Sequence, residues 1–257
     1  MGKKGAPLGL KRKPAPVFWP IHRKEFTWVV KPSPGPHACE NCLPLAAVLR
    51  DNLGFAKTRK EAKKIVSQGR ICVDGQVRRD DAYPVGLADV VSVPDIGRNF
   101  RVLPSSKGLV FQPVDGEEAK FKLCKVENKT ATKNGSIQLN LHDGSNILVK
   151  TSSSKDPQEE AYKTLDTVKV TLPEKRIVEF IRMKEKDYAI ITGGKNVGKH
   201  GVIIEIEKAA GKSRRNALVT IEDNRGNRYQ TTLGFVFALG ETRPLIALPE
   251  AIGVVRE

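Results

Sequence analysis

Two segments early in the chain place their apolar residues at helical spacing. The segment PLAAVLRDNL (44–53) predicts a short helix, because proline suits a first turn and glycine follows the last apolar residue. Thr58 and Glu61 have the spacing of a capping box, which predicts a second helix running to Gly69. The apolar face of this helix comprises Ala62, Ile65 and Val66. Its remaining surface carries Arg59, Lys60, Lys63 and Lys64.

After the second helix the apolar residues alternate with polar ones. Ile71 and Val73 follow this period, and Asp74-Gly75 is typical of a two-residue hairpin turn. Three valines within 90–93 predict a further strand. The sequence therefore predicts a compact unit of two short helices followed by a small sheet.

From residue 95 to 180 the chain is nearly neutral and predicts short strands. The dipeptides Asn134-Gly135 and Asp143-Gly144 flank the alternating segment SIQLNLH, which predicts successive hairpins. A polar loop is expected at 151–160 and another strand at 166–172. We expect a small barrel or a twisted sheet here, and the balanced charge gives no reason to assign this segment to RNA.

The C-terminal part continues the alternating pattern around a loop rich in glycine. Residues 187–206 predict a strand, the glycine-rich loop and a second strand. Further strands are expected at 217–222 and 229–239, separated by a turn at 224–227. The chain is therefore expected to be an α+β, multi-domain protein.

The N-terminal segment has a different composition. Residues 1–38 contain seven prolines, eight cations and one acidic residue. Proline removes backbone donors and restricts the preceding residue, so this segment should not fold alone. A solvated tail is one interpretation. The aromatic and apolar residues between 18 and 29, which include both tryptophans, favour an arm that becomes ordered on a partner. Its cations would contact phosphates, and its rings would dock on the body or on bases.

Charge is the strongest signal in the composition. The 257 residues include 44 Lys and Arg against 29 Asp and Glu, which gives a formal net charge of +15. This excess points to a polyanionic partner, most often nucleic acid. No apolar run is long enough to cross a membrane, and the N-terminus does not resemble a signal peptide. Four cysteines are too few for a disulfide scaffold and suit a reducing compartment.

The sequence predicts no catalytic, metal or cofactor site. Residues 193–199 match part of a phosphate-binding P-loop, but His200 stands where Ser or Thr should bind magnesium, and a β-branched run replaces the helix. Cys39 and Cys42 have the spacing of half a zinc site without a second pair, so two free thiols are the simpler interpretation. The four histidines accompany no nucleophile motif, and the acidic residues form no isolated apolar pair.

The glycine-rich loop and the second helix remain as candidate binding elements. Glycine allows a backbone to turn sharply and approach a phosphate, which Lys195 and Lys199 would neutralise. An ordinary hairpin is the alternative for this loop. Four cations within six residues favour RNA contact by the second helix, and a solvated face is the alternative.

These elements carry a resemblance to a known family. The loop GKNVGKHGVIIEI resembles a KOW motif, and residues 43–94, centred on TRKEAKKIVSQGRICVDGQVRRD, resemble the α-L RNA-binding domain. The phrases WPIHRKE, KPSPGPH, YPVGLADVVSVP, FRVLP and EEAKFKLCKV, in this order, resemble the fourth small-subunit ribosomal protein family of archaea and eukaryotes, in its archaeal form. The resemblance implies an extended basic arm (1–42), an α-L domain (43–106), a central β-rich domain (107–180) and a KOW-containing β-barrel domain (181–257).

The resemblance implies a non-catalytic constituent of the small ribosomal subunit, located in the cytoplasm. It would bind ribosomal RNA through phosphate and sugar contacts and stabilise the RNA fold during assembly and translation. The implied partners are this RNA and neighbouring ribosomal proteins, without a membrane, a small-molecule substrate, a metal or a cofactor. The implied RNA-binding residues are Lys3, Lys4, Lys11, Arg12, Lys13, Arg23, Lys24, Arg59, Lys60, Lys63, Lys64, Arg78, Arg79, Lys195 and Lys199. Cys39 and Cys42 are outside the family pattern. An RNA-modifying enzyme and a transcription-elongation factor are the alternatives, because α-L and KOW elements occur in such proteins.

Overall fold

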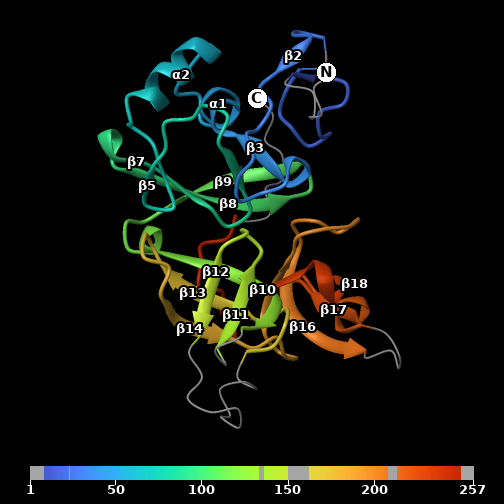
Figure 1. Ribbon diagram of the computed structural model, residues 1–257. Helices are drawn as coiled ribbons and strands as arrows, with labels where there is room; N and C mark the ends of the chain where they lie inside the picture. Colours follow the sequence, from blue (N-terminus) through green and yellow to red (C-terminus); the bar gives the residue numbers. More distant parts are fainter. Residues whose placement is uncertain (1–8, 23, 133–135, 150–161, 208–212, 250–257) are drawn as a thin grey trace, which may run out of the picture.

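The computed structural model describes residues 9–22, 24–132, 136–149, 162–207 and 213–249. Within these ranges the chain forms two lobes (Figure 1). The arm, the helices and one five-stranded sheet lie in the upper lobe, and two further five-stranded sheets lie side by side in the lower lobe. Five sequence-based expectations fall outside the described ranges: the turn at 134–135, the loop at 151–160, Lys3, Lys4 and Arg23.

The two predicted helices are confirmed in the upper lobe. Helix α1 (Leu45–Ala47) continues as a π-helical turn over Val48–Asn52, and α2 covers Arg59–Ser67. The capping box is formed, since Glu61 N donates to the Thr58 hydroxyl and the Glu61 carboxylate accepts from Thr58 N. This reciprocal pair satisfies donors that the first turn of a helix leaves free.

A small sheet follows the helices, as expected. We call the part of the chain from β3 to β9 (42–114) the helical unit. Its strands are β3 (Cys42–Pro44), β4 (Cys72–Val73), β5 (Gln76–Val77), β6 (Pro84–Gly86), β7 (Val90–Val93), β8 (Arg98–Ser105) and β9 (Gly108–Val114). Among the described residues, β3 pairs with β6 and the others form a sheet of order β5-β4-β7-β8-β9. The domain boundary expected at 106 falls inside the β8–β9 hairpin, whose pairing carries this sheet on to Val114.

The arm folds back onto the helical unit. Strand β1 (Leu10–Lys11) pairs with β2 (Trp28–Val29). Trp19 is only 2% exposed, and its Nε1 donates to the carbonyl oxygen of Cys42 at 2.9 Å. For residues 9–22 and 24–42 the structure therefore differs from the extended arm expected from the sequence, because the body of the chain itself supplies a core for Trp19.

The lower lobe contains two antiparallel sheets. The central sheet has the order β12-β11-β10-β13-β14 and comprises β10 (Phe121–Ala131), β11 (Ile137–Leu141), β12 (Asn146–Val149), β13 (Thr167–Thr171) and β14 (Ile177–Ile181). The C-terminal sheet has the order β18-β17-β16-β15-β19 and comprises β15 (Tyr188–Ile191), β16 (His200–Glu207), β17 (Leu218–Glu222), β18 (Arg228–Thr232) and β19 (Val236–Gly240). Closure of the second sheet into a KOW-type barrel stays a prediction.

The three large sheets meet in one apolar cluster. Leu103 of β8, Leu123 of β10, and Ile190 and Phe237 of β15 and β19 are all buried in it. Since removing this surface from water is favourable, the cluster holds the helical unit and both lower sheets in one arrangement.

A buried charge cluster lies at the same junction. The ammonium group of Lys122, in β10, lies 2.7 Å from Asp74, 2.5 Å from Asp89 and 3.4 Å from Asp143. His37 of the arm contacts Asp89 at 3.0 Å. Burial opposes the charge of Lys122, but Asp89 and Asp74 raise its pKa well above the ordinary value. The cluster thus joins the arm, the helical unit and the central sheet electrostatically.

Candidate nucleic-acid interface

Helix α2 presents three cations to solvent. Ala62 and Val66 are fully buried beneath it, so Lys60, Lys63 and Lys64 lie on the exposed surface. These three lysines have no ion pair with a described residue. Arg59 differs, since its Nε lies 3.2 Å from Asp81 Oδ2. The structure therefore leaves three of the four helix cations unpaired within the described part of the chain.

The segment after the β4–β5 hairpin separates the two predicted arginines. The Arg78 guanidinium lies 4.5 Å from the ring centroid of Tyr83, and its Nη2 donates to Gln76 Oε1 at 2.8 Å. Arg79 is exposed and lies near Gly69, just beyond α2. Arg79 consequently extends the cationic surface of α2, whereas Arg78 supports the local fold.

The glycine-rich loop between β15 and β16 places both of its lysines at the surface. Gly198 N donates to Ile191 O, and Ile191 N donates to Lys199 O, both at 2.8 Å. Lys199 lies 5.4 Å from the ring centroid of Tyr229, and Lys195 is exposed on the rim of a cavity of about 840 Å³. The backbone pairs fix the loop, so that its two cations project from a defined turn.

Gly198 also brings this loop against the β8–β9 turn. Its φ is +82°, and a Cβ there would lie 2.6 Å from Ser105 Cα, a backbone atom. Gly198→Ala is expected to lower the free energy of unfolding by about 2 kcal/mol or more, from left-handed strain plus this clash. Gly226→Ala is the matched control, since Gly226 has φ +79° with nothing within 4 Å of the added Cβ.

Chemical denaturation gives the free energy of unfolding of both glycine variants. The difference between the two values measures the clash of the added Cβ at position 198 with the β8–β9 turn. Equal losses in the two variants would show that the loop is free to move away from the β8–β9 turn.

The arm cations have different surroundings. Lys11 is exposed and lies 5.4 Å from the ring centroid of Trp28. Arg12 is half-buried and donates from Nε and Nη2 to Ile21 O at 3.0 and 2.8 Å, which closes a turn of the arm. Lys13 and Lys24 are exposed and have no ion pair with a described residue. Of the arm residues expected to contact RNA, Arg12 thus has a structural partner already.

The cysteine pair is asymmetric. Cys39 is exposed and Cys42 is buried. Burial, with a smaller contribution from Cys39, raises the pKa of Cys42 to about 12, so its thiol stays protonated near neutral pH. Within the described ranges, no group of three or more His, Cys, Asp or Glu side chains is arranged to hold a metal ion. Nor does any helix in these ranges have the length and apolar character needed to cross a membrane.

Comparison with known proteins identifies the family. Residues 5–40 match the RS4NT (NUC023) domain, 43–91 the S4 domain and 96–177 ribosomal family S4e. A Staphylothermus marinus protein named small ribosomal subunit protein eS4 is 50% identical over 251 residues, covering 97% of this chain and 99% of its own. The chain belongs to the S4e family of ribosomal proteins. The S4e protein of Methanocaldococcus jannaschii is 43% identical over 249 residues, covering 96% of this chain and all of its own.

A solved S4e structure agrees with this assignment. The crystal structure of the 30S ribosomal protein S4e from Thermoplasma acidophilum matches with a TM-score of 0.63 and 28% identity, covering 79% of this chain and 96% of its own. The predicted family and its archaeal form are confirmed. The S4e family is one of structural ribosomal proteins and is not an enzyme class.

Two features of the molecule could not be predicted from the sequence. One is the charge cluster around Lys122, and the other is a cationic cleft between the two lower sheets. In both cases the residues come from distant segments, and the only sequence signal is a lysine or arginine next to buried positions. Local patterns do not show that such residues meet.

Proposed function

We propose that the chain is a structural constituent of the small ribosomal subunit that binds ribosomal RNA and stabilises its fold during assembly and translation. The observation that carries this proposal is the exposed face of α2, where Lys60, Lys63 and Lys64 have no ion pair with a described residue. Its relatives are named small ribosomal subunit proteins, and an S4 domain covers the helix. The cytoplasmic ribosome is the corresponding location.

Phosphate and sugar contacts are the proposed mode of binding. Duplex RNA hides its base edges in a deep, narrow groove, so a protein surface meets mainly its backbone. A row of unpaired ammonium groups on a helix suits that backbone, and each phosphate that it neutralises releases counterions. We assign the same role to Arg79, Lys195 and Lys199, and to the exposed arm cations Lys11, Lys13 and Lys24. Neighbouring small-subunit proteins are the proposed protein partners.

Replacing Lys60, Lys63 and Lys64 together by alanine tests the proposal. We expect weaker binding to small-subunit ribosomal RNA and a slope of log affinity against log salt that is shallower by about 2, because each lost phosphate contact removes about 0.7–0.9 from it. Alanine keeps the helix propensity of these exposed positions. Filter binding over a series of salt concentrations measures both quantities.

The control removes the same charge elsewhere, with Lys120, Arg176 and Arg225 replaced by alanine. These residues are exposed and lie outside the proposed interface. An α2 variant whose salt slope equals that of the unmodified protein would show that the helix faces solvent.

A further inference from the structure

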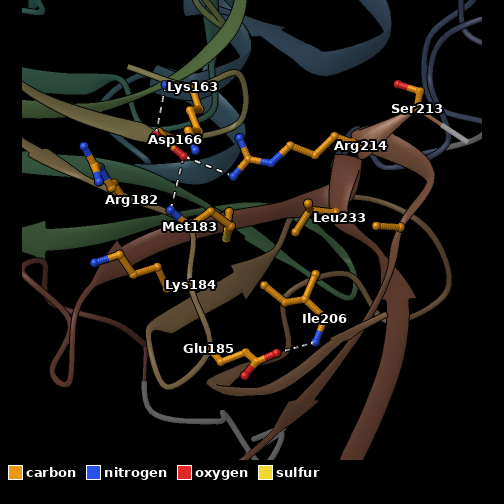
Figure 2. A pocket seen from close by; sticks show the side chains of 11 residues that line it. Lys163, Asp166, Arg182, Met183, Lys184, Glu185, Ile206, Ser213, Arg214 and Leu233 are labelled. Atoms are coloured by element: carbon orange, nitrogen blue, oxygen red, sulfur yellow. Dashed lines mark hydrogen bonds and ion pairs between the residues drawn. The ribbon is translucent and has the colours of Figure 1, made fainter. Parts of the chain in front are cut away.

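A cleft opens between the central sheet and the C-terminal sheet, and none of the residues assigned above lines it. Its volume is about 950 Å³, within the range of pockets that hold small molecules. The walls come from the segment before β13, from the link between β14 and β15, from the end of β16, from the segment before β17 and from the turn after β18 (Figure 2).

The rim of the cleft is cationic. Lys163, Arg182 and Lys184 are exposed there and have no ion pair with a described residue. Arg214 on the opposite wall is held in place, since it donates to Thr164 O and lies 3.3 Å from Asp166 Oδ1. Figure 2 shows Lys163, Arg182 and Lys184 on one side and Arg214 on the other.

The two carboxylates of the cleft already have partners. Asp166 accepts from Lys163 N at 3.1 Å and from Met183 N at 3.2 Å, in addition to its pair with Arg214. Glu185 accepts from Ile206 N at 3.4 Å. Because backbone amides and Arg214 occupy these acidic groups, the three exposed cations remain available for an anionic ligand.

The floor of the cleft is apolar, formed by Met183, Ala217 and Leu233, with Ile206 at its side. A methionine thioether is soft and packs favourably on flat aromatic rings. Beside the rim, Phe180 is 37% exposed, and its ring lies 5.6 Å from the guanidinium of Arg182. Exposed rings next to cations are the combination that binds unstacked bases.

We propose that this cleft binds an unpaired nucleotide of the RNA. Its phosphates would contact Lys163, Arg182 and Lys184, and its base would lie on the apolar floor or against Phe180. This inference rests on the proposed function and extends RNA binding to the central sheet, which the sequence left unassigned. An acidic protein segment would also match the rim, but the apolar floor and the aromatic ring beside the cations favour a base.

Lysine footprinting on the full chain tests the proposal. The protein is acetylated alone and in complex with a transcript of small-subunit ribosomal RNA, and each lysine is quantified by mass spectrometry. Lys163 and Lys184 are expected to be protected several-fold by the RNA. Lys186, which is exposed and follows Glu185, the last cleft residue of this segment, is the control and should react equally in both samples.

A charge-reversal pair provides the second readout. Arg182→Glu with Lys184→Glu is expected to weaken RNA binding about tenfold or more, since two attractive contacts become repulsive. Lys186→Glu with Arg225→Glu makes the same change in net charge outside the cleft and should have a smaller effect.

The outcomes separate the two proposals. If the unmodified chain does not bind the transcript, the proposed function itself fails. If it binds while Lys163 and Lys184 stay reactive, only the cleft inference is overturned. Protection of these lysines in intact small subunits, but not by the transcript alone, would assign the cleft to a protein partner and also overturn it.

Discussion

Replacing Lys122 by methionine is expected to lower the free energy of unfolding by about 3–5 kcal/mol, the usual cost of removing one partner from a buried ion pair. Lys122 is 1% exposed and contacts three carboxylates that come from different turns. Methionine fills a similar volume without the charge. The variant would therefore retain Asp74 and Asp89 without the ammonium group that both contact, at the junction of the helical unit and the central sheet, whereas Asp143 would keep its pair with Lys175 at 3.3 Å.

The stability that Lys122→Met loses should depend on pH. Burial opposes the charge of Asp89 and Asp143, but Lys122 outweighs it and holds the pKa of both below the ordinary value. Both groups thus bind fewer protons in the folded state than in the unfolded state. Their contribution to stability is present above about pH 4 and is lost as the pH falls below that value.

Without Lys122, the same burial raises the pKa of these carboxylates in the folded state. The penalty in Lys122→Met is then largest near neutral pH and decreases in acid, where the carboxylates become protonated. We expect the stability difference between the unmodified protein and the variant to narrow as the pH is lowered toward 4, as measured by urea denaturation at several pH values.

Lys120→Met is the matched control for this prediction. Lys120 precedes β10 and pairs with Glu117 at 2.5 Å, but both side chains are largely exposed. An exposed pair of this kind contributes about 0–1 kcal/mol. Equal losses from Lys120→Met and Lys122→Met, or a difference independent of pH, would contradict the role assigned to the charge cluster.

The start of α2 and the β4–β5 hairpin were predicted well because both are formed by residues that are close together in the sequence. Thr58 and Glu61 start α2 through their own side chains, and this requires nothing from the rest of the molecule. Asp74-Gly75 forms the expected hairpin with both residues at positive φ. Such signals are local, so composition and spacing are sufficient to find them.

The charge cluster could not be predicted in this way. Asp74 and Asp143 each had a complete local explanation as turn residues, and Lys122 lies in a strand that mixes polar and apolar residues. Their meeting depends on sheet packing between segments far apart in sequence. For the same reason, the near-neutral total charge from 107 to 180 concealed Lys163, which joins Arg182 and Lys184 only through the fold.

Residue type alone did not predict where the two tryptophans of the arm lie. Both tryptophans were expected to dock on the body or on bases, and the structure separates them. Trp19 is 2% exposed in the core of the helical unit, whereas Trp28 is 61% exposed. The carbonyl oxygen of Cys42 and the apolar surface around it hold Trp19, whereas the ring of Trp28 lies beside Lys11.

Trp19→Ala is therefore expected to lower the free energy of unfolding by about 3–5 kcal/mol, from lost burial and the cavity left behind. It would also leave the Cys42 carbonyl without its indole donor. Trp28→Ala is the matched control and should change stability by less than about 1 kcal/mol, because most of that ring already contacts solvent. Limited trypsin digestion should cut the arm faster in Trp19→Ala only, after Lys11 and Lys24, which are exposed and not followed by proline.

Fluorescence gives an independent measurement of the same anchor. In Trp28→Ala, Trp19 is the remaining tryptophan, so its emission reports the arm directly. We expect emission typical of a buried indole, and a urea midpoint equal to that of the circular dichroism signal, because the arm and the helical unit share one core.

If Trp19 becomes exposed at a lower urea concentration than the rest of the chain unfolds, the arm detaches first. In that case its exposed cations Lys11, Lys13 and Lys24 would have to be ordered by RNA at an entropic cost, and Trp19→Ala would leave RNA affinity nearly unchanged. A coincident transition predicts the opposite: the arm is held before RNA arrives, and Trp19→Ala weakens RNA binding by releasing it.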